Sequence, residues 1–174
     1  MRTNSMAQKS DCSSAKKDDF SLFFCGDAFL RTRDGDDPFA LISEWFGGCT
    51  ACINCETSLE GGKQTKKNVS LSVDEKSLEY IPQNVSLVSI VNNHVSDSGN
   101  PAKLVQALER RGKVVVGPGN PSQSHMTRDG MDVDFFSAYF NLPRLRVSYN
   151  GARADALERM LLDSNAERKI VNLH

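Results

Sequence analysis

Four short polar clusters in this sequence carry side chains that could do chemistry. They are Gly26-Asp27, Asn54-Cys55-Glu56, Asn92-Asn93-His94 with Asp97, and His174. Carboxylate, amide oxygen and imidazole groups together suit hard or borderline divalent cations such as Mg²⁺, Mn²⁺, Fe²⁺ and Zn²⁺. Two such ions roughly 3.5–4 Å apart could activate a water molecule and clamp a phosphoryl group. The residue types therefore indicate a metal site that acts on phosphoryl groups.

Taken singly, each cluster also has an ordinary structural interpretation. An Asp after a strand often forms a turn or caps a helix, and adjacent Asn residues are common in loops. A lone His at the end of a strand is more often structural than a ligand. Their shared position is more informative, because each cluster follows a predicted strand. Ligand sites in open α/β sheets lie outside the carboxyl ends of the strands.

The elements that would position these clusters can be predicted from apolar and alternating runs. Strands are predicted over residues 20–25, 50–53, 68–73, 85–91, 113–116 and 169–173. Helices are predicted over 37–46, 101–111 and 152–162, with one or two helical turns over 75–80. Asp37 and Asn100 can act as N-caps, each followed by a proline that fits the first turn. Residues 117–130, rich in Gly, Pro and Ser, are predicted to form a surface loop. The order of elements predicts an α/β fold.

Composition and charge limit the classes of protein that fit. The 174 residues suit one domain, and 39% hydrophobic with 25% charged residues is typical of a globular chain. A net charge of −1 gives no electrostatic basis for binding nucleic acid or an anionic membrane. No apolar run approaches the roughly 20 residues that span a bilayer. Residues 1–19 are polar, so we expect a disordered lead-in rather than a signal peptide, reduced cysteines and a cytoplasmic location.

Six segments, in the order in which they occur, resemble a known family. They are FFCGDAFLR, DPFALI, INCETSL, VNNHVSDSG, VVVGPG and IVNLH. The family is the bacterial capsule-synthesis protein CapA family, linked to poly-γ-glutamate production, within the calcineurin-like metallophosphoesterase superfamily. The resemblance runs from about Phe20 to His174 and is most specific at Asn92 to Gly99. It implies a partial metallophosphoesterase-like α/β sandwich, with ligands at strand C-terminal ends, that hydrolyses a phosphoester in capsule or poly-γ-glutamate synthesis.

The resemblance also implies which residues hold divalent metal ions, two of them in a complete domain. Asp27 would be the ligand after the first strand, and Glu56 a bridging or terminal carboxylate. Asn93 would bring its side-chain oxygen to the second ion, and His174 would be a further ligand. Asn54 would lie next to the ligands and position them.

Two further residues receive catalytic roles from the same motif. His94 would face the leaving group as a proton donor or as a hydrogen-bond partner of the phosphate. Asp97 would orient the imidazole and fix its tautomer. The substrate would be an anionic polymer or a phosphoester.

The family pattern extends beyond the residues present here. It continues after the position of His174 with Trp-Gly and later supplies a Gly-His-x-His-type segment whose histidines complete the metal shell. This sequence has three histidines, and His125 lies in the predicted Gly/Pro/Ser-rich loop. We therefore expect residues 20–174 to be the N-terminal portion of the domain, with its C-terminal part missing or supplied by a separate chain.

Three other interpretations of the sequence stay open. The spacing Cys49-x-x-Cys52-x-x-Cys55 resembles a zinc or iron–sulfur motif, but such sites usually have four thiolates, so small buried residues are favoured. For the function, the alternative to a hydrolase is a non-catalytic component that binds a metal or an anionic polymer during assembly or export. An inactive fragment is the third possibility.

Overall fold

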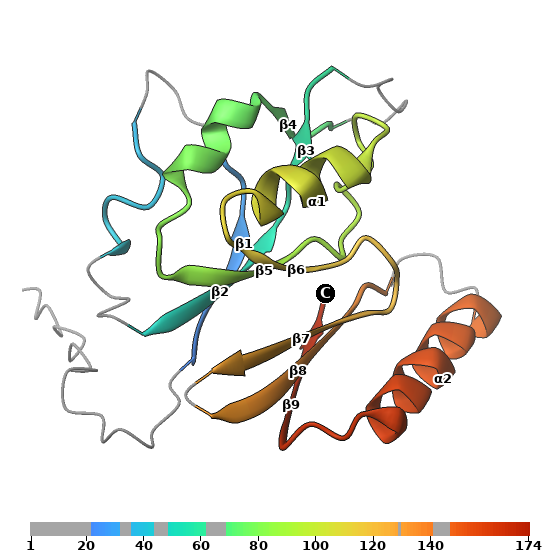
Figure 1. The fold of residues 1–174 in the computed structure, drawn as a ribbon. Coiled ribbons are helices and arrows are strands. Elements are labelled where there is room, and N and C mark those ends of the chain that lie inside the picture. Colours follow the sequence, from blue (N-terminus) through green and yellow to red (C-terminus); the bar gives the residue numbers. More distant parts are fainter. Residues whose placement is uncertain (1–21, 32–35, 44–48, 62–68, 129, 141–146) are drawn as a thin grey trace, which may run out of the picture.

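The computed structural model describes residues 22–31, 36–43, 49–61, 69–128, 130–140 and 147–174, with only the backbone for 147–151. Two main sheets organise the chain (Figure 1). Sheet A is parallel, in the order β1-β2-β5-β6, with strands β1 (Leu22–Ala28), β2 (Thr50–Cys55), β5 (Val85–Ser89) and β6 (Val114–Val116). A 3₁₀ helix precedes β5 and an α-helix joins β5 to β6, so the fold is α/β.

Sheet C lies against one face of sheet A and consists of three strands in the order β7-β8-β9. They are β7 (Ser122–Arg128), β8 (Met131–Ala138) and β9 (Arg168–Leu173), with β7 antiparallel and β9 parallel to β8. A separate two-stranded parallel sheet pairs β3 (Ser58–Leu59) with β4 (Ser72–Val73).

Helices cover the outer faces of the two main sheets. The 3₁₀ helix η3 (Glu75–Tyr80) and α1 (Pro101–Glu109) pack on the face of sheet A that points away from sheet C. The long helix α2 (Val147–Asp163) packs through Leu157 on Phe136 and Ala138 of β8. The chain thus forms four layers, with η3 and α1 at the top of Figure 1 and α2 at the lower right, beside sheet C.

Alternation along the strands explains why two separate cores form. Ile53 and Cys55 of β2 join the core beneath the helices, whereas Cys52 faces sheet C and packs near Val133 and Phe135. Successive side chains of a strand point to opposite faces, so a strand buried on both sides appears as an apolar run. All six residues of β2 are buried.

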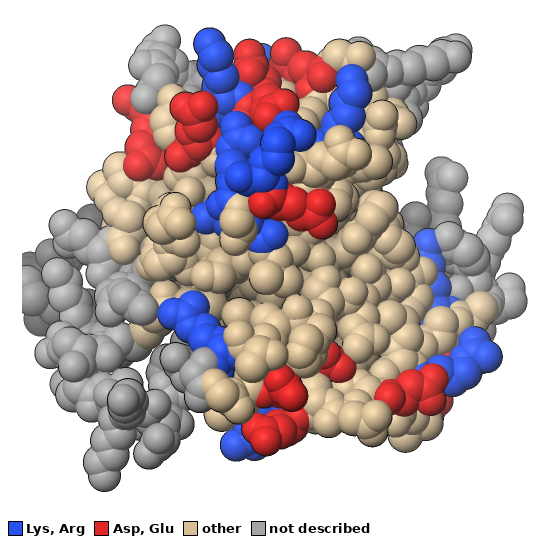
Figure 2. Space-filling model, viewed as in Figure 1, with Lys and Arg blue, Asp and Glu red and all other residues tan. Residues whose placement is uncertain are grey.

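The face drawn in Figure 2 carries charges of both signs, with one mixed cluster over η3 and the end of α1 and others along the lower part of the molecule. There Glu75 accepts hydrogen bonds from Arg110 at 3.0 Å and from Arg111 at 3.2 Å. These two bonds hold the pKa of the Glu75 carboxyl below its ordinary value. The described helices include none that is long and apolar enough to cross a membrane.

Most of the predicted elements are confirmed, with shifted ends. The exceptions have physical causes. The predicted loop over 117–130 was wrong, because Ser122–Arg128 forms β7, whose pairing with β8 depends on backbone hydrogen bonds rather than on apolar side chains. Asn100 starts α1 without a side-chain cap bond.

Two other predictions fall partly outside the described residues. Of the predicted helix over 37–46, the described part makes hydrogen-bonded turns after Asp37, which accepts from the Phe39 amide; Trp45 and Phe46 lie outside. Of the predicted strand over 68–73, only Ser72–Val73 is a strand, and Val69 is exposed. The predicted disordered segment 1–19 lies outside the described residues altogether.

Candidate metal centre

The side chain of Asp27 is turned toward sheet C by an irregularity in β1. Phe24 pairs with Cys52, but the next pair is Asp27 with Asn54, so β1 has one more residue than β2 over this stretch. Gly26 takes a φ of +71° here, which residues with a Cβ adopt only under strain. An extra residue reverses the alternation of side chains along a strand. Asp27 therefore faces the same side as Asn54.

Asn54 and Glu56 come from the carboxyl end of β2. The buried Asn54 donates from Nδ2 to Oδ1 of Asp27 at 2.7 Å. Glu56 follows the strand, and its backbone amide donates to the carbonyl of Ala28 at 2.9 Å, which ties the two strand ends together. Neighbouring parallel strands thus deliver a carboxylate each to one edge of sheet A.

His174 arrives from the other sheet. Its amide donates to the carbonyl of Ala138 at 3.0 Å, and its carbonyl accepts from the amide of Phe140 at 2.9 Å, so pairing with the β8 end extends through His174. The imidazole also lies beside Tyr139, with ring centroids 5.7 Å apart. Backbone pairing therefore fixes the position of the residue, and Tyr139 lies beside its ring.

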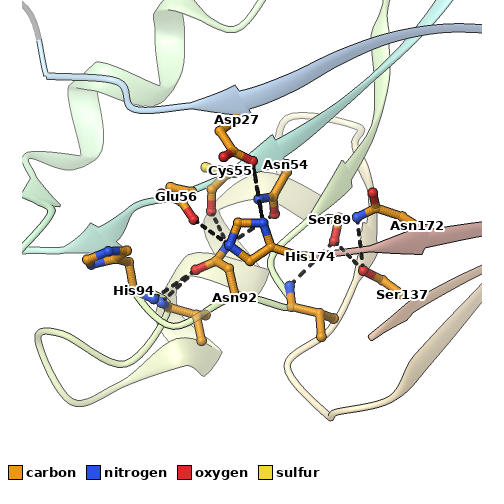
Figure 3. Close-up of polar contacts among 12 residues, drawn as sticks. Asp27, Asn54, Cys55, Glu56, Ser89, Asn92, His94, Ser137, Asn172 and His174 are labelled. Atoms are coloured by element: carbon orange, nitrogen blue, oxygen red, sulfur yellow. Dashed lines mark hydrogen bonds and ion pairs between the residues drawn. The ribbon is translucent and has the colours of Figure 1, made fainter. Parts of the chain in front are cut away.

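Asp27, Glu56 and His174 converge on one point (Figure 3). His174 Nε2 lies 2.8 Å from Oε1 of Glu56, and Nδ1 lies 3.6 Å from Oδ1 of Asp27. One ligand atom from each of the three residues lies within 4.8 Å of the others, which makes them the one such His/Cys/Asp/Glu group in the described part of the chain. Two carboxylates and an imidazole suit a divalent cation. These three residues could hold one ion.

A pocket of about 200 Å³ opens beside this group. Asp27, Asn54 and His174 line it together with Asn172, and Phe24 and Leu173 close its sides. Asp27 is more than half exposed, at 58%, whereas Glu56 is only 16% exposed. A small polar molecule can therefore reach the group from the Asp27 side.

Asn92 organises the loop that follows β5. It is buried, donates to Oδ1 of Asn54 at 3.2 Å and to the Cys55 carbonyl at 2.9 Å, and accepts from the amides of His94 and Val95. All of its polar atoms are used within the protein. The sequence had directed attention to Asn93; the structural role of Asn92 was missed, although its place directly after a strand was a signal.

His94 and Asp97 form a pair, as the motif predicted. His94 Nδ1 lies 2.7 Å from Oδ2 of Asp97, which is fully buried and also accepts from the amide of Leu71 at 2.9 Å. The His94 ring stands apart from the three converging residues in Figure 3. Asn93 is half-buried in the same loop, and its role as a ligand of a second ion stays a prediction.

The thiolate alternative is wrong for the described cysteines. Cys52 and Cys55 point to opposite faces of sheet A, and Cys49 is disulfide-bonded, contrary to the expectation that all cysteines are reduced. Burial raises the pKa of the Cys52 and Cys55 thiols to about 12, which opposes the thiolate form that binds metal.

His125 belongs to a separate polar network on the α2 side of sheet C. Its Nδ1 lies 2.8 Å from Oδ1 of the buried Asp134, whose other oxygen accepts from Gln123 and Ser164. The sequence placed His125 in a loop, so this network was missed. It joins β7, β8 and the segment after α2, away from the candidate metal centre.

Hydroxyl and amide groups between the sheets lie beneath the centre. Ser89 and Ser137 are both buried and their hydroxyls lie 2.9 Å apart, while Asn172 donates to Ser137 at 3.1 Å. These bonds fix β5 against β8 and β9 just before the strands reach the centre. In the sequence, the position of Ser89 within the apolar run 85–91 was the signal for this contact between the sheets.

Comparisons with known proteins add only distant structural likeness, of which one solved structure is an example. No family model and no curated protein matches the chain. A hypothetical protein from Thermus thermophilus, known from its crystal structure, is similar over 71% of this chain, with 21% identity and a TM-score of 0.42. This chain spans 45% of the length of that protein.

Proposed function

We propose that this chain is a metal-dependent phosphoesterase-type domain of the kind that the CapA-like motifs imply. The observation that supports it best is the convergence of Asp27, Glu56 and His174, from the ends of three strands, with ligand atoms within 4.8 Å. Their two negative charges balance one divalent cation. The polar pocket beside them is open to a small anionic group.

The chemistry would divide between the ion and the side chains. A bound divalent ion supplies Lewis-acid activation of water and of a phosphoryl oxygen. Asn54 holds Asp27 in place through its 2.7 Å hydrogen bond. Asp97 engages Nδ1 of His94, which leaves Nε2 as the nitrogen that would give a proton to the leaving-group oxygen.

The biological process and the substrate class are proposed from the motif resemblance. It suggests a substrate from capsule or poly-γ-glutamate synthesis, either a phosphoester or an anionic polymer. A second ion would need donors beyond the three convergent residues, with Asn93 as one and a further segment or a separate chain as the source of the others.

A second candidate function is binding of an anionic polymer through one ion, without turnover. It is favoured by the number of donors, because Asp27, Glu56 and His174 suffice for one ion whereas the two-metal hydrolytic clamp needs more.

Calorimetric titration with Mn²⁺ and Zn²⁺ tests both functions. We expect saturable binding of at least one ion by the native chain, and an affinity at least about 10-fold weaker after Asp27→Asn, because that change removes a charged ligand. Asp155→Asn, at an exposed position on α2, is the matched control and should bind like the native chain. His125→Gln and Cys52→Ser should also bind normally.

The outcomes separate the proposals. An absence of metal-dependent heat in the native chain would rule out both functions. Metal-dependent release of phosphate from aryl phosphates, lost in Asp27→Asn, supports the hydrolase. Metal-dependent binding of poly-γ-glutamate without phosphate release from any ester tested supports the second function. Loss of binding in Cys52→Ser would reinstate the thiolate interpretation.

A further inference from the structure

A second pocket, of about 170 Å³, adjoins Asp27 on the helix side of β1. Cys25, Ala28, Phe29 and Phe39 line it and belong to the core beneath the helices or pack against that core. Asp27 lines this pocket as well as the polar pocket of the candidate metal centre, so the two pockets adjoin at this residue.

Apart from Asp27, the side chains that line this second pocket are apolar. Pro38 and Ile42 complete the set of apolar side chains. Apart from Asp27, the side chains here offer a charged or highly hydroxylated group no strong hydrogen-bonding partner to replace its water.

The volume indicates the size of the occupant. Sites for whole drug-sized ligands measure about 300–1,000 Å³. An apolar cavity of about 150 Å³ in another protein binds one benzene molecule. The space beside Phe29 and Phe39 therefore suits a single aromatic ring or a branched alkyl group.

We propose that this pocket binds the apolar organic group of a phosphomonoester whose phosphoryl group lies at the candidate metal centre. The inference deepens the proposed function and rests on it. It predicts that aryl and branched alkyl phosphates are preferred over polyol phosphates such as glycerol phosphate. Asp27, at the junction, would mark the boundary between the phosphoryl group and its organic substituent.

Adjacent residues of one turn supply a matched pair of variants. Ile42 lines the pocket and is 40% exposed, whereas Leu41 is 90% exposed and does not line it. Ile42→Gln should weaken binding of phenylphosphonate to the Mn²⁺-loaded chain about fivefold or more, because apolar contact area is lost. Leu41→Gln should leave it unchanged, and methylphosphonate should bind both variants and the native chain alike.

A neutral probe separates failure of the pocket from failure of the metal centre. Binding of 4-fluorobenzyl alcohol to the metal-free chain, followed by fluorine NMR line broadening, should be lost in Ile42→Gln and kept in Leu41→Gln. If the native chain binds no metal but the alcohol binds in this pattern, the proposed function fails and the apolar pocket stands without its phosphoryl neighbour. Equal binding of phenylphosphonate and methylphosphonate, or equal behaviour of the two variants, would overturn the inference.

Discussion

Asn92 shows how one amide can hold the ends of two strands together. It donates to Asn54 and to the Cys55 carbonyl and accepts from two amides of the loop after β5. A side chain that satisfies four partners in a buried position can be replaced by few others, since each donor or acceptor left without a partner costs free energy.

Replacing Asn92 with Ala should therefore destabilise the fold by about 2–4 kcal/mol, because several buried polar groups lose their partner. Unfolding in urea measures the change. Asn100→Ala is the matched control: Asn100 is exposed and makes no side-chain cap bond, so its loss should change the unfolding free energy by less than about 0.5 kcal/mol. Similar losses for the two variants would contradict the role assigned to Asn92.

The residues of the candidate site were only partly predictable. Asp27, Glu56 and His174 were named because each follows a predicted strand and fits the CapA-like motifs. The choice between Asn92 and Asn93 could not be made, since adjacent residues in a loop point in directions that depend on backbone angles the sequence does not specify. The reversal at Gly26 that aims Asp27 toward sheet C was equally hidden.

At the scale of elements, the hairpin of β7 and β8 is held by polar groups as well as by backbone pairing. The sequence of β7, SQSHMTR, has no alternation of apolar and polar residues, so periodicity could not reveal this strand. The buried carboxylate of Asp134 gathers His125, Gln123 and Ser164 around it. By contrast, β5 was predictable because its sequence is a clear apolar run.

The pH dependence of stability should reveal the Asp134 contacts. Burial raises the pKa of this carboxyl, but hydrogen bonds from Ser164 and His125 outweigh it and leave the pKa below the ordinary value. A carboxyl whose pKa is lower when folded stabilises the fold above its unfolded pKa of about 3.9, and this contribution is lost as the pH falls through the folded pKa.

The native chain should therefore exceed Asp134→Asn in unfolding free energy at pH 6, with the difference shrinking below about pH 4. Denaturant unfolding at a series of pH values measures it. Asp155→Asn, at an exposed position, should show a small difference at every pH. If the difference in unfolding free energy between the native chain and Asp134→Asn stays constant down to pH 2, the assigned contacts are contradicted.

At the scale of the whole molecule, the candidate metal centre is shared between two sheets. Asp27 and Glu56 come from sheet A, whereas His174 follows the last strand of sheet C. Phe135 lies in the core between these sheets, and the adjacent Phe136 lies in the core between sheet C and α2. Two neighbouring residues thus report on two different interfaces.

Phe135→Leu and Phe136→Leu should each lower the unfolding free energy by about 1–2 kcal/mol, because each removes buried apolar area. Only Phe135→Leu should also weaken Mn²⁺ binding, since it loosens sheet C against sheet A and so shifts His174 relative to the carboxylates. Urea unfolding and calorimetry on the same samples measure both effects. Equal metal affinity in the two variants would show that the sheets are positioned by other contacts.

The position of His174 would couple metal binding to the stability of the fold. On the proposed function, an ion held by residues 27, 56 and 174 is a reversible cross-link between the first and last strands of the fold. Whatever binds only the folded state adds its binding free energy to stability. Metal occupancy and cohesion of the two sheets are then one coupled equilibrium, in which a tighter interface raises the affinity and a bound ion strengthens the interface.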